Sequence, residues 1–399
     1  MPDPRRILLK QTQSPGDMLT FSRPAYDLKR SHPNWEIGID TPCNELFQNN
    51  PFTTELSEND PTVEVYNITY DDINKSGWSG EHFSDAFRHD IEKKLNSDPA
   101  MVAKWGETVI PKTGILPELF LTDEEKGWYS QVHCTYHWDG QFWLLNAGRK
   151  WDNILKQYHR WQAVVDILNE AWQGKVRIVQ IGHRGALGQP HYHPELKGVF
   201  NLIGQTSIRQ LIRLAYHSTG LLGPISFQFV LGAAFEKPTV VCAGGKEGTR
   251  WHIYNHVQWV KRNGCLPCAV SDGCWKGGKK GECARLVRAK GMEEDVPLCF
   301  ELIKPQELAD RVLDYYEGGR LSIPDSELWH EEGKVRFEEY YQSGEFPPEE
   351  AYTKKILPVL KPGEFCRKCG EAIVPYKTVP RGKCRGCGII VSLEAKDES

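Results

Sequence analysis

The sequence lacks any long apolar run. Its first apolar stretch is Ile7-Leu8-Leu9, which is far shorter than the core of a signal peptide or a membrane-spanning helix. We therefore expect a protein that does not insert into a membrane and that works in the cytoplasm. The chain also lacks long-range repeats and low-complexity tracts, which excludes solenoid and fibrous architectures.

Neither sign of charge is in large excess. The 399 residues include 49 basic and 53 acidic side chains, giving a net charge of -4. Because the two signs are mixed along the chain, no global field draws the protein to nucleic acid or to an anionic membrane. With 40% hydrophobic residues and 13 Trp, the composition is that of a globular protein, and the length predicts two or three domains.

Nine of the 12 cysteines fall into two groups. Paired Cys-x-x-Cys spacing in an intracellular chain of this size favours metal ligation over a disulfide framework. The remaining three are expected to be buried, inert thiols. The first group comprises Cys265, Cys268, Cys274, Cys283 and Cys299, the second Cys366, Cys369, Cys384 and Cys387, and the scattered three are Cys43, Cys134 and Cys242.

The terminal group has the two-knuckle spacing of a zinc ribbon, with a glycine after each pair (Gly370 and Gly388). The first group offers five thiolates for four ligand places. Such a set binds Zn tetrahedrally or Fe in the manner of rubredoxin, and spacing does not choose between them.

The N-terminal region predicts a β-α-β unit. Residues 7–9 form a short apolar strand, residues 19–30 have helical spacing that ends before His32-Pro33, and residues 35–40 alternate like a second strand. Units of this kind build parallel sheets. Further on, residues 62–69 are strand-like and residues 80–95 helical.

A second α/β series begins at residue 142 and repeats the order strand, glycine, helix, which is typical of a doubly wound domain. A helix near residues 306–316 is expected to return to the first domain. The expected elements are strands at 142–146, 175–181, 199–203 and 239–242, helices at 160–172, 207–216 and 226–235, and loops at 147–150 and 218–224. The predicted domains are residues 1–140, residues 141–320 with a cysteine finger at 265–299, a helical linker at 321–360 and the ribbon at 361–399.

Several motifs share the order and spacing of a known family. They are Arg6-Ile7-Leu8-Leu9-Lys10 with Ser14-Pro15-Gly16-Asp17-Met18-Leu19, Leu202-Ile203-Gly204-Gln205-Thr206-Ser207, Gly232-Ala233-Ala234-Phe235-Glu236-Lys237-Pro238-Thr239 and Cys265-Leu266-Pro267-Cys268. Across residues 5–317 the chain resembles the family 9 glycosyltransferases, which include the heptosyltransferases. The resemblance implies a GT-B fold, two Rossmann-like domains facing a cleft, and inverting transfer of a sugar from a nucleoside diphosphate sugar to an acceptor hydroxyl. It also implies that the first cysteine group forms a metal finger like that of autotransporter heptosyltransferases.

Glycosyl transfer needs a base for the acceptor hydroxyl and donors that hold the departing diphosphate. Asp17, in a glycine-containing loop ahead of a helix, corresponds to the general base proposed for the resembled family. The alternative is that Asp17 only caps that helix.

The donor site is expected in the second domain, at the carboxyl ends of its strands. Lys156 fits the family's phosphate-binding lysine, while Arg149 and Lys150 compete for that role and a solvated surface lysine is the alternative. The amides of the helix that opens at Ser226 and Phe227 can cradle a diphosphate without a catalytic divalent cation. The strand-end positions are Gly148, Gly182 and Gly204, the last followed by Thr206.

One segment departs from the family. Many members carry Asp-Thr-Gly and then a His where this chain has Ile225-Ser226-Phe227-Gln228-Phe229-Val230. The donor is then other than ADP-heptose, or activity is lost. The pair His191 and His193, in a loop with glycine and proline, is expected to be solvated rather than liganding.

Two alternatives stay open. The ribbon's basic residues suit a glycosyltransferase that acts on a modified base in DNA. A non-catalytic module that binds a sugar nucleotide or a protein is the second. The acceptor (protein, glycan or nucleic acid) and the oligomeric state, a homo-oligomer included, are open. The basic residues are Arg367, Lys368, Lys377, Arg381, Lys383 and Arg385.

We predict about two thiolate-bound metal ions per chain, with zinc in the ribbon. So small a segment cannot fold on apolar burial alone, and metal binding must supply its stability. Replacing Cys384 and Cys387 with Ser should remove one ion and unfold only the tail. Elemental analysis checks this, and an unchanged metal content in the double variant would exclude the ribbon.

Overall fold

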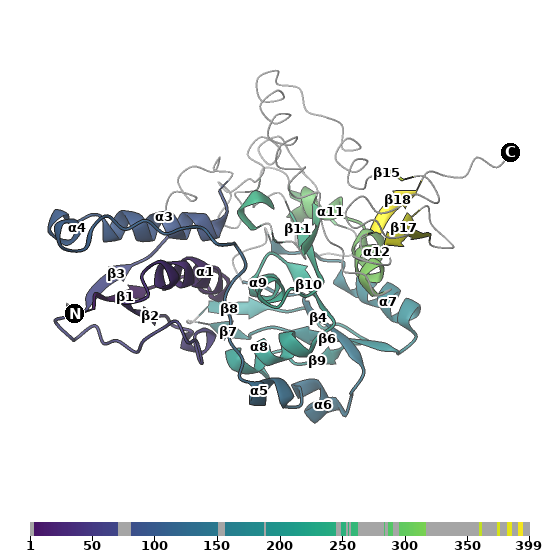
Figure 1. The fold of residues 1–399 in the computed structure, drawn as a ribbon. Coiled ribbons are helices and arrows are strands. Elements are labelled where there is room, and N and C mark those ends of the chain that lie inside the picture. The colour runs from purple at the N-terminus through teal and green to yellow at the C-terminus, as the bar shows by residue number, and fades with distance from the viewer. Residues whose placement is uncertain are drawn as a thin grey trace, which may run out of the picture.

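The protein is an α/β chain built on two parallel sheets (Figure 1). The computed structural model describes residues 4–70, 81–150, 156–186, 189–244, 249–252, 254, 257–261, 283, 286–289, 295–316, 359–360, 373–375, 381–384 and 390–393. Within this part of the chain, no helix is both long and apolar enough to cross a membrane.

The first domain has a three-stranded parallel sheet in the order β2-β1-β3. Its strands are β1 (Arg6–Lys10), β2 (Glu36–Asp40) and β3 (Glu64–Asn67). The helix α1 (Pro15–Ser31) connects β1 to β2 and packs against α3 (Phe83–Leu95). The predicted β-α-β unit is therefore confirmed. The short elements η1 (Asn44–Leu46) and α4 (Pro99–Trp105) complete this region.

The helix α1 begins earlier than its hydrophobic spacing predicts. Ser14 is the N-cap and Pro15 the first helical residue, a position that tolerates proline because its missing N–H would be unpaired there anyway. Asp17 consequently lies in the first helical turn, and its expected place in the preceding loop is wrong. The end of the helix at Ser31, before His32-Pro33, is as predicted.

The second domain has a six-stranded parallel sheet in the order β12-β11-β10-β4-β6-β9. This order reverses direction between β4 and β10, as in doubly wound folds. The strands are β4 (Gln141–Asn146), β6 (Val176–Ile181), β9 (Phe200–Asn201), β10 (Gly220–Pro224), β11 (Thr239–Ala243) and β12 (Val257–Lys261). Its helices are α7 (Trp161–Trp172), α8 (Ile208–His217), α9 (Phe227–Ala234) and α12 (Pro305–Tyr316).

Three expectations about this domain are wrong. The loop expected at 218–224 contains β10, a fully buried strand between β4 and β11. Its glycines and proline mimic a loop signal, but neighbouring side chains fill the space that the glycines leave. The helix α12 packs on α7 and β11 rather than returning to the first domain. The expected loop at 147–150 contains β5 (Arg149–Lys150), which joins β7 (Gly185–Ala186) and β8 (Gln189–Tyr192) in a small sheet.

The remaining elements are short. The segment between the domains carries α5 (Asp123–Gly127) and α6 (Gln131–Tyr136), both of which contact α8. After β11 come η3 (Thr249–His252), the antiparallel pair β13 (Leu286–Arg288) and β14 (Asp295–Pro297), and α11 (Leu298–Glu301). Near the C-terminus, one four-stranded sheet contains β15 (Val359–Leu360), β16 (Ile373–Pro375), β17 (Arg381–Cys384) and β18 (Ile390–Leu393).

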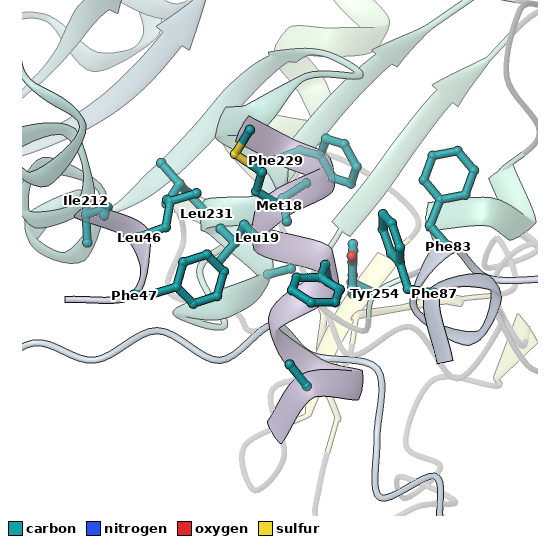
Figure 2. Close-up of a cluster of buried hydrophobic side chains, with 14 of the residues drawn as sticks. Met18, Leu19, Leu46, Phe47, Phe83, Phe87, Ile212, Phe229, Leu231 and Tyr254 are labelled. Atoms are coloured by element: carbon teal, nitrogen blue, oxygen red, sulfur yellow. The ribbon is translucent and has the colours of Figure 1, made fainter. Parts of the chain in front are cut away.

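One apolar core is continuous between the two domains. Figure 2 shows Met18 and Leu19 of α1 among Phe229 and Leu231 of α9, all at most 2% exposed. A large hydrophobic interface restrains relative domain motion. The shared core therefore fixes the position of α1 relative to α9.

The position of β10 gives a stability prediction for Gly220→Ala. A Cβ at Gly220 would lie 2.6 Å from the ring of Trp143, which is 1% exposed. Because that ring has no room to move, we expect the change to lower the free energy of unfolding by about 1–3 kcal/mol. Gly127→Ala is the control, since a Cβ there meets nothing within 4 Å. Equal urea midpoints for the two variants would contradict the buried placement of β10.

Candidate active site

The N-terminal ends of α1 and α9 meet where the two domains join. A Cβ placed on Gly16 would lie 3.5 Å from Cα of Phe227 and 3.7 Å from Cγ2 of Val230. The first turns of the two helices are thus in van der Waals contact. Helix N-termini carry partial positive charge and unpaired N–H groups, so this junction favours an anion.

Asp17 lies half-buried at this junction and caps its own helix. Its Oδ2 accepts a hydrogen bond from the Ser14 backbone N at 3.1 Å and a short one from Ser14 Oγ, completing a capping box. The capping interpretation is therefore confirmed. It uses only one carboxylate oxygen, because no residue in the described part of the chain donates a hydrogen bond to Oδ1.

The surroundings of Asp17 alter its proton affinity. Burial raises the pKa of this carboxyl above the ordinary aspartate value, while the Ser14 hydrogen bonds and the positive charges of His252 and Lys156 act in the opposite direction. Burial is the largest effect. A carboxylate with a raised pKa is a better base near neutral pH than an ordinary aspartate.

Lys156 is the candidate phosphate contact whose charge acts on Asp17. Its Nζ donates a hydrogen bond at 3.2 Å to the carbonyl oxygen of Ile225, just before α9. Arg149 instead places its guanidinium over the ring of Tyr192, 5.4 Å from the centroid, and Lys150 is exposed on β5. Of the three candidates, Lys156 is the one that contacts the residue before α9 and whose charge lowers the pKa of Asp17.

The start of α9 is fixed by polar side chains that sequence reasoning missed. Asn146, at the end of β4, donates to Ser226 Oγ at 2.8 Å and accepts from Gly148 N at 2.9 Å. Gln228 donates to the carbonyl oxygen of Pro224 at 2.7 Å. Asn146 therefore ties the β4 loop to the helix cap, and its only sequence signal was an amide at a strand end. Phe227 follows as the first residue of α9 and packs against the shared core.

Basic side chains cover the three expected glycine positions. A Cβ on Gly148 or on Gly182 would lie 2.1 Å or 2.0 Å from the imidazole of His193, and one on Gly204 would meet Arg184 at 3.0 Å. Because glycine has no Cβ, these three positions leave room for the side chains of His193 and Arg184. The half-buried Thr206 follows at the start of the α8 region.

The ring of His193 is only partly exposed to solvent. The ring is half-buried, and its Nε2 lies 3.0 Å from the carbonyl oxygen of His183. Burial lowers the pKa of His193, and the charges of His183 and Arg184 lower it further, against the opposing effect of the His183 hydrogen bond. His191 is likewise half-buried, with Nδ1 3.1 Å from the same carbonyl oxygen. The small β5-β8-β7 sheet holds both rings because it folds back over the strand ends.

Two further residues at the junction, His252 and Tyr254, were not anticipated. His252 is 5% exposed, and Tyr254 is fully buried with its hydroxyl 3.4 Å from Thr20 Oγ1. They lie in a segment after β11 whose irregular pattern gave no signal. Tertiary packing alone brings them to α1.

The cysteine predictions remain largely outside the described residues, which exclude Cys265, Cys268, Cys274, Cys366, Cys369 and Cys387. In the part of the chain that is described, no three potential ligands cluster as a metal site. Of the three scattered thiols, Cys242 is buried as predicted and Cys43 is half-buried. Cys134 is exposed, so the prediction that it is buried is wrong. Burial raises the pKa of Cys242 well above the ordinary thiol value.

The architecture is that of a GT-B glycosyltransferase: two Rossmann-like domains that meet at the carboxyl ends of their strands. A family 9 glycosyl transferase from Veillonella parvula is similar, with TM-score 0.50 and 10% identity over 78% of this chain and 97% of that chain. TibC, an iron-containing dodecameric glycosyltransferase from enterotoxigenic E. coli, is similar with TM-score 0.54 and 14% identity over 79% of this chain and 76% of that chain. TibC in complex with ADP-D-beta-D-heptose gives TM-score 0.51 and 13% identity over 78% and 77%.

At such low identity the likeness establishes the fold alone. No protein-family model matches the sequence, and no curated protein sequence matches it. The expected GT-B fold is thus confirmed, and the structural neighbours are heptosyltransferases and family 9 glycosyltransferases.

The packing of His193 gives a prediction for Gly148→Ala. The new Cβ would overlap His193 Nδ1 and push the ring toward solvent. Because burial is the main cause of its lowered pKa, the pKa of His193 should rise toward the ordinary histidine value. A histidine NMR titration measures this, with the His193 signal assigned by its loss in His193→Gln. An unchanged midpoint in a folded Gly148→Ala variant would contradict the described contact.

Proposed function

We propose that this protein is a cytoplasmic, inverting glycosyltransferase that moves a sugar from a nucleoside diphosphate sugar to an acceptor hydroxyl. The observation that carries the proposal is the convergence of Asp17, Lys156 and the N-terminus of α9 at one junction between the domains. The GT-B fold, shared with the family 9 glycosyltransferase and TibC, supports it.

In this proposal Asp17 is the general base. The capping box uses Oδ2 and holds the carboxylate in one orientation, while Oδ1 takes the proton of the acceptor hydroxyl. A hydroxyl that loses its proton as it attacks the anomeric carbon displaces the diphosphate from the opposite face, which inverts the configuration. The raised pKa of Asp17 suits this step because it brings the base closer to working pH.

The departing diphosphate would be held by Lys156 and the backbone amides that open α9. These donors lie on the second-domain side of the junction, and the hydrogen bond of Lys156 to Ile225 keeps its ammonium beside the helix N-terminus. Preorganised N–H donors and a positive charge stabilise the negative charge that develops on the leaving group. This arrangement requires no catalytic divalent cation.

We propose that the protein recognises its donor through contacts other than those by which the resembled family recognises ADP-heptose. The segment 225–230, where many members of the resembled family carry an Asp and a His, has neither residue here, and its ends Ile225 and Val230 are 6% and 2% exposed and belong to the shared core. Buried aliphatic groups make no polar contact with a sugar. Recognition must then come from other side chains, such as Arg184 and His193 at the strand ends.

We also propose two structural metal sites, Zn or Fe at the 265–299 cysteines and Zn at the ribbon cysteines. TibC is iron-containing and dodecameric, which supports testing this chain for iron and for a homo-oligomer. The acceptor class is open.

Two substitutions test the proposed base, Asp17, and the proposed diphosphate contact, Lys156, separately. Asp17→Asn keeps an oxygen that can cap Ser14, so we expect intact folding and donor binding with transfer about 100-fold or more slower. Lys156→Ala should instead weaken nucleoside diphosphate binding by about 10-fold or more, because it removes a charge-assisted contact. Transfer assays and calorimetric titration with diphosphates measure these effects.

The matched control is Lys150→Ala, since Lys150 is exposed. It should leave both quantities unchanged. A thermal-shift screen over nucleoside diphosphates and their sugars identifies the donor first, because a ligand bound only by the native state raises the Tm. Full activity in Asp17→Asn would refute the base assignment, and no response to any nucleotide would refute the glycosyltransferase proposal.

A further inference from the structure

Arg209 lies on α8 in the second domain, and its side chain binds groups that lie outside that domain. Its Nε donates a hydrogen bond to Glu125 Oε1 at 2.6 Å and its Nη2 donates to Glu125 Oε2 at 2.5 Å, which makes a bidentate ion pair with α5. Nη2 also donates to the carbonyl oxygen of Phe120 at 2.7 Å, and Nη1 donates to that of Glu45 in η1 at 3.3 Å. One arginine therefore joins α8 to the first domain and to the segment between the domains.

Glu125 is held in place by other groups besides Arg209. Its Oε2 accepts hydrogen bonds from Asn49 Nδ2 at 3.1 Å and from the Thr122 main-chain N at 2.9 Å. The Thr122 side chain in turn accepts from Glu125 N at 3.1 Å and completes the capping box of α5. Because both carboxylate oxygens are engaged, the carboxylate is held in one orientation toward the guanidinium.

The contact with Phe120 extends to the helix that carries Asp17. The ring of Phe120 lies against Phe52, with centroids 5.6 Å apart, and Phe52 packs edge-on against Tyr26 of α1, with centroids 4.5 Å apart. On the other side, α8 packs against α9. Arg209 is therefore connected through packed elements to both helices whose first turns meet at the junction.

The pair of Arg209 and Glu125 is buried and charged. The two side chains are 11% and 8% exposed, so dissolved salt screens them little. The hydrogen bond from Arg209 is the largest effect on Glu125 and lowers the pKa of that carboxyl to about 2, against the opposing effect of burial. Arginine does not lose its proton in proteins. The pair is thus ionised at neutral and mildly acidic pH.

The directionality of these bonds distinguishes them from the apolar contacts nearby. The shared core also holds η1 against α8, through Leu46, Phe47 and Ile212 (Figure 2), but apolar contacts are non-directional and tolerate small rotations of one surface over another. Apolar side chains in place of a buried ion pair often give equal or greater stability. A planar guanidinium has donors in a fixed geometry, so its hydrogen bonds are lost when the partners rotate.

We propose that Arg209 is a positioning residue for sugar transfer: its hydrogen bonds to Glu125 and to two main-chain carbonyls fix the rotation of the second domain against the first. The inference rests on the proposed function, in which Asp17 of the first domain is the base and the diphosphate is bound by the second domain. The distance between the two therefore depends on the orientation of the domains. A misplacement of about 1 Å in such a geometry costs about 100-fold in rate.

The direct test is the range of domain orientations in Arg209→Gln, which lacks the charge and the fork of donors. Double electron–electron resonance measures the distance distribution between nitroxide labels at Lys93 of α3 and Glu170 of α7, both of which are exposed. The labels are attached to p-acetylphenylalanine introduced at these two positions, which leaves the native cysteines unmodified. We expect a wider distribution in Arg209→Gln than in the wild type, and the measurement needs no substrate.

The kinetic readout separates orientation from donor binding. In Arg209→Gln, kcat should fall by about tenfold or more, because Asp17 no longer stays at a fixed distance from the bound diphosphate. The Kd for ADP and UDP should stay unchanged, since the proposed diphosphate contacts lie within the second domain. Arg209→Lys keeps the charge without the fork, so it should lie between Arg209→Gln and the wild type in both distribution width and kcat.

Arg5→Gln is the matched control. Arg5 is also buried and forms a bidentate ion pair with a glutamate, in which Nε donates to Glu64 Oε1 at 3.1 Å and Nη2 to Oε2 at 2.7 Å. This pair joins the start of β1 to β3 within one sheet. Its loss should lower the Tm and leave the distance distribution as in the wild type.

An unchanged distribution in folded Arg209→Gln would overturn the inference, as would an equal widening in Arg5→Gln. If Arg209→Gln does not fold, Glu125→Gln decides in its place, because it removes the ionic partner and keeps the size of the side chain. If the distribution widens but the wild type binds neither ADP nor UDP and transfers no sugar, Arg209 sets the domain orientation and the proposed function fails. The two failures are therefore distinguishable.

Discussion

The contact between the first turn of α1 and the first turn of α9 is the constraint on which the rest of the structure depends. The two turns come so close that a Cβ on Gly16 would lie 3.5 Å from Cα of Phe227, at ordinary van der Waals distance. The apolar residues that follow on both helices form one core, so the two domains are joined rather than separated by an open gap. The proposed catalytic groups lie at the polar end of this joint, where two positive helix ends meet.

In this arrangement the capping role of Asp17 can coexist with its proposed role as the base. Capping fixes the side chain, and a fixed carboxylate with one oxygen left over is better placed to accept a proton than a mobile one. Burial makes the ionised form costly, and the positive charges around it reduce that cost. Capping and catalysis, which look like alternatives in the sequence, are therefore compatible in the structure.

The strand ends of the second domain show a different use of glycine. Gly148, Gly182 and Gly204 each have a basic side chain where a Cβ would be, contributed by the short segment that carries His183 to His193. This places imidazole and guanidinium groups along the edge where doubly wound domains bind ligands. With the Arg184 guanidinium on it, this edge suits an anionic diphosphate more than a neutral ligand.

The sequence alone determined the order of strands and helices, the doubly wound second domain and the approximate position of Asp17, because hydrophobic periodicity and capping residues act over a few neighbours. It failed at β10, whose Gly-Leu-Leu-Gly-Pro has the local chemistry of a loop and becomes a strand only because β4 and β11 pair with it on both sides. It also gave no sign of Asn146, His252 or Tyr254. Those residues reach the site from segments far apart in the chain, and only the packing of α3, α9 and the segment after β11 brings them together. Local pattern predicts most of the elements, while tertiary packing decides β10 and which side chains contact one another at the site.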